Sequence, residues 1–335
     1  MQKVTVIGAG SWGTTLADVL GSNGHEVLLW ARSEERCAEI NEQHTNSRYL
    51  PGFDLSPNIT ATSDLERACG HSHWILLVVP SHGLRQCARD MGGFLSGEHM
   101  IVHATKGIEQ QSFRRMSQVL REETSVRKIG VLSGPNLARE IMRRQPAGTL
   151  VASKYREVLE RSQALLHSPT FRVYTGSDVV GAEVGGAFKN IVAVAAGVVD
   201  QLGMGDNTRA LLLTRGLNEM AHVGAAMGAN VLTFGGLAGI GDLMCTCASP
   251  LSRNHQVGER LARGQSLEQI RAEMHMVAEG VKTARSTFQF AAHHSLDLPI
   301  VRAVHAVIYE QRPVVEVIQD LMALPASHEL VELSW

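Results

Sequence analysis

A glycine-rich segment near the amino terminus constrains the fold of this chain more than any other feature. The segment is Gly8-Ala9-Gly10-Ser11-Trp12-Gly13, which has the spacing G-x-G-x-x-G. It follows directly on the apolar residues Val4–Ile7, and the pattern from Thr14 to Leu20 is typical of a helix. The motif binds a dinucleotide when it lies in such a strand–turn–helix setting, whereas a bare G-x-G-x-x-G carries little weight.

Each glycine of the motif has its own part in a Rossmann-type unit. Gly8 permits the tight turn, Gly10 lets the backbone approach a pyrophosphate, and Gly13 lets the helix pack closely on the strand. The free N–H groups at the start of the helix then face the phosphates. A glycine-rich turn without a ligand is the alternative, and the placement of the motif favours cofactor binding.

The first half of the chain alternates short apolar strands with helical segments. We expect strands at Val4–Ile7, Glu26–Trp30, Ile59–Thr62, Ile75–Val79, Met100–His103, Ile129–Leu132, Thr149–Ala152 and Phe171–Tyr174. Amphipathic segments such as Thr14–Asn23 and Phe113–Glu123 lie between most of them. Strands that alternate with helices predict a parallel, doubly wound sheet that is covered on both faces.

The pattern becomes helical after residues 175–178. We expect helices at Val179–Gln201, Asn207–Met227, Arg253–Arg263, Leu267–Met274, Val281–His294, Ile300–Gln311 and Val314–Leu324. Ser266 and Gln269 predict a capping box, and Pro299 and Pro313 lie where the last two helices should begin. The chain is therefore predicted to have a Rossmann-type NAD(P)-binding domain over residues 1–176, a helical substrate and catalytic domain over 177–324, and a tail over 325–335.

The composition argues against several functional classes. The chain has 335 residues, of which 44% are hydrophobic, and its formal net charge of -2 gives no basic surface for nucleic acid. We expect no membrane span and no signal segment, because the apolar stretches are short. The five scattered cysteines fit a reducing cytoplasm. No second ligand cluster accompanies Cys245-Thr246-Cys247, so no metal site is expected.

The end of the second predicted strand bears on the choice between NAD and NADP. NAD-specific folds usually carry Asp or Glu there, but this chain has Trp30-Ala31-Arg32. Arg32 can bind a 2′-phosphate with a charged fork, which favours NADP over NAD. Two features keep the alternative open: Arg32 could be a solvated loop charge, and the nearby Glu34 and Glu35 could restore some tolerance of NADH.

Several residues with candidate chemical roles lie at strand ends and in the helical half. Lys106 follows the strand Met100–His103, where a lysine can pair with a phosphate but is more often a surface charge. Lys189 and Asn190 lie in a helix of small apolar residues, and burial would lower the lysine pKa toward that of a general base. Asp242 offers an acceptor for a lysine or a hydroxyl, and Ser252-Arg253-Asn254 at a helix start predict an anion pocket.

Together these motifs resemble the NAD(P)-dependent glycerol-3-phosphate dehydrogenases of bacterial type. The matching segments are GAGSWGT, ATKG, LSGPNLAREI, GGAFKNIVAVAAG, NTRALLLTRGLNEM, GLAGIGDL, SRN and VAEG, in the family's order over nearly the whole chain. The resemblance implies a Rossmann-type domain followed by an all-helical domain, as in the 6-phosphogluconate-dehydrogenase-like fold. It also implies hydride transfer between NAD(P)H and dihydroxyacetone phosphate, giving sn-glycerol 3-phosphate for phospholipid synthesis.

The resemblance further implies a role for each matched residue. The implied cofactor-binding residues are Gly8, Gly10, Ser11, Trp12, Gly13, Arg32, Tyr49, Lys106, Ala138, Arg253, Val277 and Glu279. The implied substrate-binding residues are Lys106, Gly134, Asn136, Lys189, Asn190, Asp242, Ser252, Arg253 and Asn254. Lys189 is the implied proton acceptor in alcohol oxidation. Asn136 departs from the family, which usually has Ser or Thr at that position, so its contact is in doubt.

Two other functions stay open on the sequence alone. A two-domain NADP-dependent reductase of the β-hydroxyacid or ketopantoate type would share the architecture and the helical lysine, but not the Ser252-Arg253-Asn254 pocket. A non-catalytic NADP sensor would be expected to lack Lys189 or Asp242, and both are present. We expect a small-molecule substrate, no nucleic-acid partner and a cytoplasmic homodimer.

Overall fold

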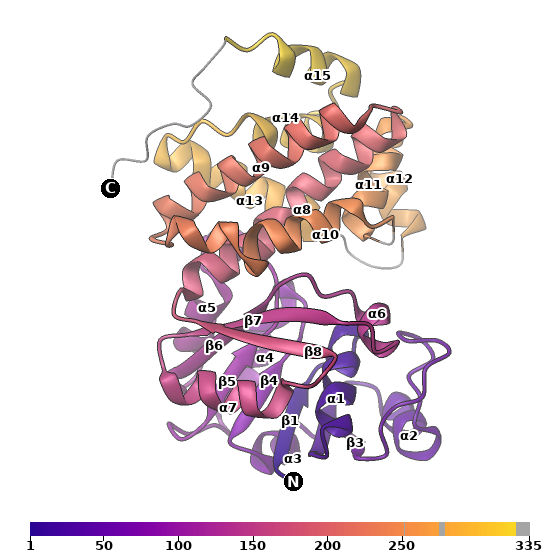
Figure 1. The fold of residues 1–335 in the computed structure, drawn as a ribbon, viewed down its shortest axis with the longest axis vertical. Coiled ribbons are helices and arrows are strands. Elements are labelled where there is room, and N and C mark those ends of the chain that lie inside the picture. The colour runs from indigo at the N-terminus through magenta and orange to yellow at the C-terminus, as the bar shows by residue number, and fades with distance from the viewer. Residues whose placement is uncertain (251, 275–278, 326–335) are drawn as a thin grey trace. The chain divides into compact units, whose positions relative to one another are not determined.

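The computed structural model describes residues 1–250, 252–274 and 279–325, which are drawn in colour in Figure 1. The chain forms two compact units. The first comprises Met1–Glu109 and Arg114–Glu183, and the second begins at Val184 and also takes in Gln110–Phe113. The domain boundary predicted between residues 176 and 177 stays a prediction. The predicted tail lies, from residue 326 on, outside the described residues.

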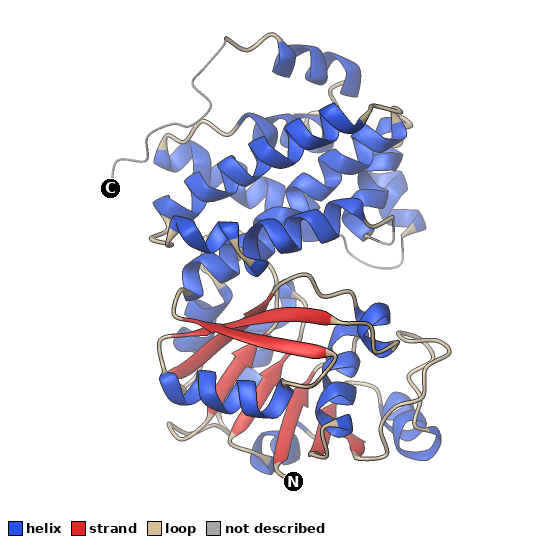
Figure 2. Cartoon of the chain, in the orientation of Figure 1, coloured by secondary structure: helices blue, strands red, loops and turns tan. Residues whose placement is uncertain are grey.

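The first unit is built on an eight-stranded sheet (Figure 2). The strands are β1 (Lys3–Ile7), β2 (Glu26–Trp30), β3 (Ile59–Thr62), β4 (Trp74–Leu77), β5 (Met100–His103), β6 (Lys128–Ser133), β7 (Ala147–Ser153) and β8 (Phe171–Gly176). All eight predicted strands are confirmed, with ends that differ by at most two residues. Their order is β3-β2-β1-β4-β5-β6-β7-β8. The order reverses between β1 and β4, and ligands of such sheets bind outside the carboxyl ends of the strands at this point.

One strand pair departs from the predicted parallel sheet. Strand β7 pairs antiparallel with β6, while β8 is parallel to β7 and the remaining pairs are parallel. The connection from β6 to β7 contains only the five-residue helix α6 (Ala138–Met142). A parallel return usually needs a full crossover helix, so the short connection leaves β7 to run back beside β6.

Helices cover both faces of this sheet. They are α1 (Ser11–Ser22), α2 (Glu34–Gln43), α3 (Leu65–His71), α4 (Ser81–Gly92), α5 (Met116–Glu123), α6 and α7 (Arg156–Leu166). The side chains of β1 alternate between two apolar clusters. Val4 and Val6 join the cluster that contains residues of α1 and α7, and Ile7 joins the one with residues of α4 and α5. Both faces are thus buried, which confirms the doubly wound prediction.

The helix predicted from Phe113 begins later than expected. It starts at Met116, because Gln111 and Phe113 both have positive φ values, 68° and 55°, which a right-handed helix excludes. The amphipathic period of the sequence does not record such a turn, so the predicted start was wrong by three residues.

The second unit is built of helices joined by turns and loops, and its described residues contain no strand. Its helices are α8 (Val179–Gln201, which starts in the first unit), α9 (Asp206–Ala226), α10 (Asp242–Ala248), α11 (Arg253–Ala262), α12 (Leu267–Glu273), α13 (Glu279–His294), α14 (Pro299–Tyr309) and α15 (Val314–Met322). The predicted helices are confirmed within two residues at each end, and the capping box of Ser266 and Gln269 is present. Helix α10 was not predicted. A 3-10 turn, Val231–Gly235, and a π turn, Leu237–Gly241, precede it.

Helix α8 is the core helix of the second unit. By length and composition it could cross a membrane, but 89% of its most apolar window is buried within the protein, as in the core helix of many proteins without a membrane span. It packs against α11 at two glycines. A Cβ on Gly197 would lie 1.9 Å from the His255 carbonyl oxygen, and one on Gly258 would lie 1.9 Å from the Val194 oxygen. This close crossing fixes the start of α11 against the middle of α8.

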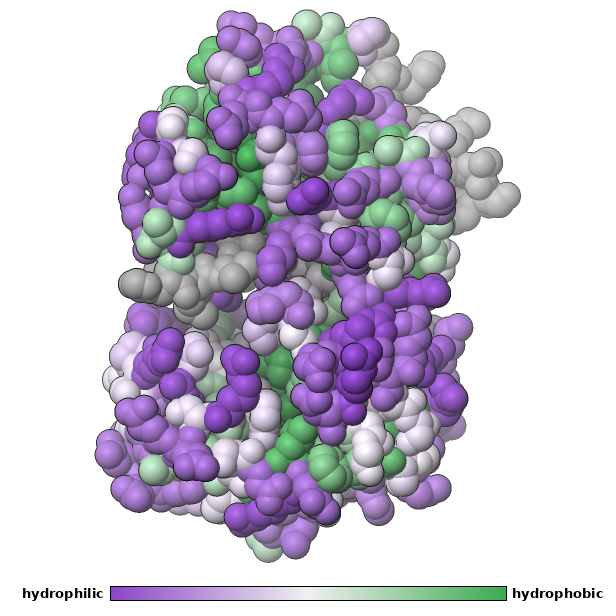
Figure 3. All heavy atoms as spheres, turned by 180° about the vertical axis from the view of Figure 1, so that it is seen from behind, coloured by the Kyte–Doolittle hydropathy of each residue, from purple (hydrophilic) through white to green (hydrophobic). Residues whose placement is uncertain are grey.

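Polar side chains dominate the outer surface seen in Figure 3. On that face hydrophilic residues cover most of each unit, and apolar atoms reach the surface in smaller areas. This distribution agrees with the apolar clusters being buried on the two faces of the sheet and along α8.

Candidate active site

The glycine-rich turn between β1 and α1 has the geometry predicted for it. Gly8 has a φ of +113°, and a Cβ there would lie 2.3 Å from the Val78 carbonyl oxygen. A Cβ on Gly13 would lie 1.8 Å from the Gly8 carbonyl oxygen. No other residue fits at either position, so the strand and the helix are held close together.

Gly10 lies over open space. A Cβ there would meet no atom within 4 Å, and no side chain caps the start of α1. The first N–H groups of the helix are therefore open to an anion, which fits the pyrophosphate of a dinucleotide. Ser11 and Trp12, the first residues of α1, are half-buried, and Trp12 packs against the apolar cluster of α1.

A loop from Asn46 to Leu50 is fastened to this turn. The fully buried Asn46 donates through Nδ2 to the Ala9 carbonyl oxygen at 3.0 Å and to Thr14 Oγ1 at 2.8 Å. Ser11 Oγ donates to the Tyr49 carbonyl oxygen at 2.9 Å. The Tyr49 backbone is thus fastened to the glycine-rich turn, and the contact of Tyr49 with the cofactor stays a prediction. The brace from Asn46 was missed, because nothing in the sequence marks that side chain as buried.

Arg32 extends from the end of β2 and is exposed. Within the described part of the chain it makes no hydrogen bond or ion pair. The guanidinium is therefore available to a ligand, and no carboxylate occupies the position that an acid holds in NAD-specific folds.

Lys106 and Gly134 lie together at the carboxyl ends of β5 and β6. The Lys106 Nζ donates to the Gly134 carbonyl oxygen at 3.4 Å. Gly107, the next residue, has a φ of +149° and passes close to Ser81. A Cβ added to Gly107 would lie 2.8 Å from the Cβ of Ser81. The sequence predicted both Lys106 and Gly134 as site residues, and the structure places them side by side.

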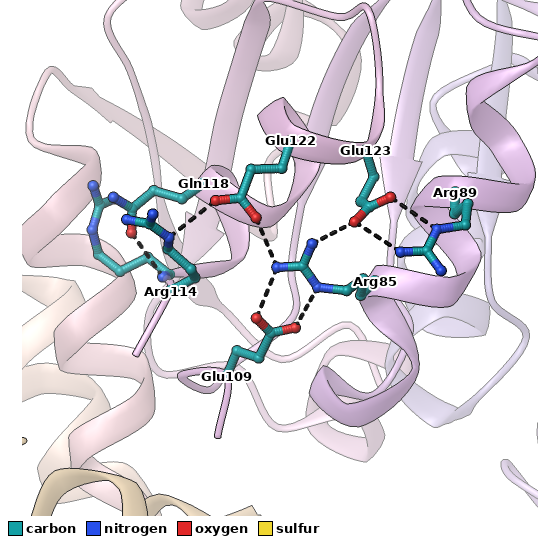
Figure 4. Close-up of polar contacts among 8 residues, drawn as sticks. Arg85, Arg89, Glu109, Arg114, Gln118, Glu122 and Glu123 are labelled. Carbon is teal, nitrogen blue, oxygen red and sulfur yellow. Dashed lines mark hydrogen bonds and ion pairs between the residues drawn. The ribbon is translucent and has the colours of Figure 1, made fainter. Parts of the chain in front are cut away.

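An ion-pair network anchors the segment that follows Lys106 (Figure 4). Arg85, on α4, binds Glu109 with two hydrogen bonds of 2.7 and 2.8 Å. The same guanidinium contacts Glu122 at 2.8 Å and also Glu123, both on α5. Hydrogen bonds to the three carboxylates raise the pKa of Arg85. This network was not predicted, because Arg85, Glu109 and the two glutamates of α5 lie in three separate segments of the chain.

Asn136 is engaged within its own unit. Its Nδ2 donates to the carbonyl oxygens of Pro135 and Gly148, each at 3.1 Å, and its Oδ1 accepts from Thr149 Oγ1 at 3.0 Å. The asparagine that replaces the usual Ser or Thr therefore braces the loop between β6 and β7. Ala138, the first residue of α6, packs against the apolar cluster of α1.

A buried lysine lies at the centre of the second unit. Lys189 is 6% exposed and Asp242 only 1%. The Lys189 Nζ forms an ion pair with Asp242 Oδ1 and donates to Thr246 Oγ1 at 2.7 Å. Asp242, expected to accept from a lysine or from a hydroxyl, is paired with the lysine in this structure, and the carboxylate compensates the buried ammonium. Thr246 was missed, although it follows Asp242 by one helical turn and so shares its face.

Local packing brings Asp242 to Lys189. Gly185, one turn before Lys189 on α8, passes so close to the π turn that a Cβ would lie 2.1 Å from the Ala238 carbonyl oxygen. The π turn leads directly into α10, whose first residue is Asp242. The two glycine-rich sequences around Gly185 and Gly239 thus allow the backbone approach on which the ion pair depends.

The start of α11 is joined to α8 and α13 through Asn254. Its Nδ2 donates to Asn190 Oδ1 at 2.9 Å, and its Oδ1 accepts from the Gly280 N–H at 2.9 Å. Ser252 caps α11 by accepting from the His255 N–H, and Arg253 is exposed at the first helical position.

Of the last two predicted site residues along the chain, Val277 and Glu279, the structure describes only one. Glu279 is the first residue of α13. Val277 lies outside the described residues.

A second, partly buried charge cluster supports α11. His255 Nε2 lies 2.8 Å from Asp200 Oδ2 on α8, and Arg209 donates to the other carboxylate oxygen at 2.6 Å. Burial alone would raise the pKa of Asp200, but the hydrogen bonds from Arg209 and His255 lower it. Neither His255 nor Asp200 was predicted, because their meeting depends on the crossing of two helices.

Each half of the predicted site is built within one unit. The glycine-rich turn, Arg32 and Lys106 belong to the first unit, and Lys189 and Arg253 belong to the second.

Among the described residues, no group of three or more His, Cys, Asp or Glu side chains could hold a metal ion.

Family models for the two halves of one enzyme match this chain. The N-terminal model of the NAD-dependent glycerol-3-phosphate dehydrogenases matches residues 3–159, and the C-terminal model matches residues 178–319. The chain belongs to this family. The resemblance drawn from GAGSWGT, GGAFKNIVAVAAG and the other motifs is confirmed.

Individual glycerol-3-phosphate dehydrogenases are similar over almost their full length. A glycerol-3-phosphate dehydrogenase (NAD(P)+) of Staphylococcus saprophyticus is 45% identical over 325 residues, which are 96% of this chain and 98% of that protein. A protein of the same name from Bacillus thuringiensis is also 45% identical and covers 98% of both chains. The crystal structure of glycerol-3-phosphate dehydrogenase from Coxiella burnetii has a TM-score of 0.91 at 32% identity, and covers 96% of this chain and 99% of its own.

Proposed function

We propose that this protein catalyses reversible hydride transfer between NAD(P)H and dihydroxyacetone phosphate, with sn-glycerol 3-phosphate as the product of reduction. The observation that carries the proposal is the buried Lys189, paired with Asp242 in a member of the glycerol-3-phosphate dehydrogenase family. The relatives at 45% identity bear the name of this activity.

Lys189 is the proposed acid and base of the reaction. In reduction its ammonium donates a proton to the alkoxide oxygen that develops at the carbonyl, and in oxidation its amine accepts the hydroxyl proton. The contacts with Asp242 and Thr246 hold Nζ in a defined position within the buried centre of the second unit. NAD(P)H supplies the hydride when it is bound.

The substrate phosphate is proposed to bind at the start of α11. Arg253 is exposed at the first helical position, and the neighbouring Asn254 is held by Asn190 and by the Gly280 N–H. A cation at a helix amino terminus, with Ser252 as its cap, suits a phosphate dianion. Binding energy from the phosphate would then position the carbonyl carbon. Lys106, Gly134 and Asn136 are proposed further contacts.

The cofactor is proposed to lie on the glycine-rich turn, with NADP preferred over NAD. The open space at Gly10 and the uncapped start of α1 suit the pyrophosphate. The exposed Arg32 at the end of β2 suits a 2′-phosphate, and no acid stands there to bind a ribose 2′-hydroxyl. Further proposed contacts of the same cofactor are Ser11, Trp12, Tyr49, Ala138, Val277 and Glu279.

The cellular setting is also proposed. We infer that the protein works in the cytoplasm as a homodimer and supplies the phospholipid backbone. The free state of all five cysteines supports a reducing compartment. Sedimentation equilibrium of the purified protein tests the dimer, and a monomeric mass at micromolar concentration would contradict it.

One activity screen tests the proposed function. NADPH oxidation is measured with dihydroxyacetone phosphate, with unphosphorylated dihydroxyacetone, and with ketopantoate and short β-keto acids. We expect turnover of dihydroxyacetone phosphate at least about a hundredfold more efficient than that of the other carbonyls, because only it engages the phosphate pocket. Preferred turnover of ketopantoate or a β-keto acid would contradict the proposal. The same assay with NADH gives the cofactor preference.

A further inference from the structure

Arg36 is a charged residue of the first unit to which neither the sequence motifs nor the family resemblance gave a role. It is the third residue of α2, one helical turn beyond Arg32, and its N–H is the donor to the N-capping Ser33 at 3.3 Å. Its side chain is half-buried, unlike the exposed Arg32.

The guanidinium of Arg36 is held in place but lacks a polar partner. Its central carbon lies 4.7 Å from the centroid of the Tyr49 ring, within cation–π distance. Its Nη1 atom is buried and makes no hydrogen bond within the described part of the chain. Leaving a buried charged donor unpaired is costly, so such a group in a native protein requires an explanation such as a bound water, ion or functional role.

The neighbouring carboxylate does not supply that partner. Glu39, one turn further along α2, accepts hydrogen bonds from Thr45 Oγ1 at 3.0 Å and from the Ser47 N–H at 2.6 Å. Among the described side chains no carboxylate lies within ion-pair distance of Arg36. Arg36 does interact electrostatically with Glu39 and helps to lower the pKa of that carboxyl, but it makes no direct ion pair with it, so the guanidinium can still bind an anion from outside the chain.

The ring beneath Arg36 belongs to the cofactor turn. The Tyr49 carbonyl oxygen accepts from Ser11 Oγ at 2.9 Å, and Asn46 fastens the same loop to Ala9 and Thr14. Arg36 is thus fixed on one side by its helix and on the other by a loop bound to the glycine-rich turn. Arg32 lies four residues before Arg36, just beyond the end of β2.

We propose that Arg36 acts with Arg32 to bind the 2′-phosphate of NADPH and so determines the preference for NADPH over NADH. A guanidinium presents a planar fork that matches a phosphate, and stacking on Tyr49 holds that plane before the ligand arrives. The partly exposed guanidinium then gains a charged acceptor only from the cofactor that carries the phosphate. This inference rests on the proposed function, because it requires that the protein binds the dinucleotide.

Direct binding measurements on two matched variants test this inference. In Arg36→Met the apolar stem remains and the guanidinium is lost. The matched control is Arg48→Met, because Arg48 lies over the same ring at 5.7 Å but is exposed. Dissociation constants for NADPH and NADH are measured by fluorescence, and competition by adenosine 2′,5′-bisphosphate and by 5′-AMP isolates the phosphate. Thermal melting reports whether each variant is folded.

The expected result is a change in the preference between cofactors. A charged hydrogen bond is worth about tenfold or more in affinity, so Arg36→Met should bind NADPH and adenosine 2′,5′-bisphosphate about tenfold or more weakly. NADH and 5′-AMP should change less than about twofold, and Arg48→Met should change neither by more than that. Should Arg36→Met not fold, Arg36→Lys keeps the charge without the fork and should lose part of the preference.

Other outcomes overturn either this inference or the proposed function. An unchanged ratio of NADPH to NADH affinity in Arg36→Met or Arg36→Lys would show that Arg36 only braces Tyr49, and so would equal losses for both cofactors. A wild-type protein that binds NADPH but does not reduce dihydroxyacetone phosphate would instead refute the proposed function and leave the role of Arg36 intact.

Discussion

The close crossing of α8 and α11 gives a prediction whose size follows from the structure. A Cβ on Gly258 would lie 1.9 Å from the Val194 carbonyl oxygen and 3.0 Å from the Val198 nitrogen. Ordinary carbon contacts need about 3.5 Å or more. In Gly258→Ala, therefore, α11 has to move away from α8 by more than about 1 Å, because both clashing atoms belong to backbone.

The free-energy cost has two parts. Overpacking of this kind typically costs about 1–3 kcal/mol of unfolding free energy. The displacement also lengthens the hydrogen bonds from Asn254 to Asn190 and from His255 to Asp200, which are 2.9 and 2.8 Å long. A buried polar group left unpaired costs about 1–3 kcal/mol, so we expect a total loss of about 2–6 kcal/mol.

Urea denaturation and steady-state kinetics measure the effect. Gly70→Ala is the matched control, because Gly70 is an exposed residue of α3 whose added Cβ would meet no atom within 4 Å. It should be neutral or stabilise by about 0.5–1 kcal/mol. In Gly258→Ala the KM for dihydroxyacetone phosphate should rise much more than the Kd for NADPH, because α11 carries Arg253. A Gly258→Ala protein with the urea midpoint and the KM of the wild type would refute the view that this crossing positions the phosphate pocket.

Three further predictions concern single charged residues. Arg32→Asp should weaken NADPH binding by about 2 kcal/mol or more in a fluorescence titration and NADH binding much less; equal losses would contradict its proposed role. Arg253→Ala should raise the KM for dihydroxyacetone phosphate at least about tenfold in steady-state assays, and an unchanged KM would place the anion pocket elsewhere. Burial raises the pKa of Glu219 to about 7 although its carboxylate accepts from the Ile300 and Val301 N–H groups. The pKa of Glu219 in the folded state exceeds its usual value of 4.5. The stabilising contribution of this group is therefore complete below pH 4.5 and is lost as the pH rises through about 7. Glu219→Gln should therefore make the unfolding free energy depend less on pH between 4.5 and about 7. Urea denaturation at several pH values measures this, and the same pH dependence as in the wild type would contradict the prediction.

Much of the fold could be predicted because it depends on local patterns. The short run of buried residues in β1 and the helical periods of α8 and α9 are properties of short segments, and the turn at Gly8 needs a residue without a Cβ. The antiparallel strand β7 could not be predicted in this way. Its direction depends on how far the chain travels between β6 and β7, which hydrophobic periodicity does not record.

The site was predictable where the residue type itself is unusual for its setting. A lysine in an apolar helix needs a counterion, so Lys189 and Asp242 could be foreseen as partners. Thr246, Asn46 and His255 could not, since threonine, asparagine and histidine are ordinary in either a buried or an exposed position. Their roles appear only when a distant segment supplies the hydrogen-bond partner, as Thr14 does for Asn46.

The turnover number of Lys189→Met tests the central claim most directly. The variant keeps the apolar stem but leaves Asp242 buried without its counterion, so a loss of about 3–5 kcal/mol in unfolding free energy is expected and folding is checked first by thermal melting. With dihydroxyacetone phosphate and NADPH at saturation, kcat of the folded variant should fall about 10²–10⁴-fold, because a positioned proton donor is lost. NADPH affinity measured by fluorescence should change little. A folded Lys189→Met protein with wild-type kcat would contradict the account and leave Lys189 with a structural role alone.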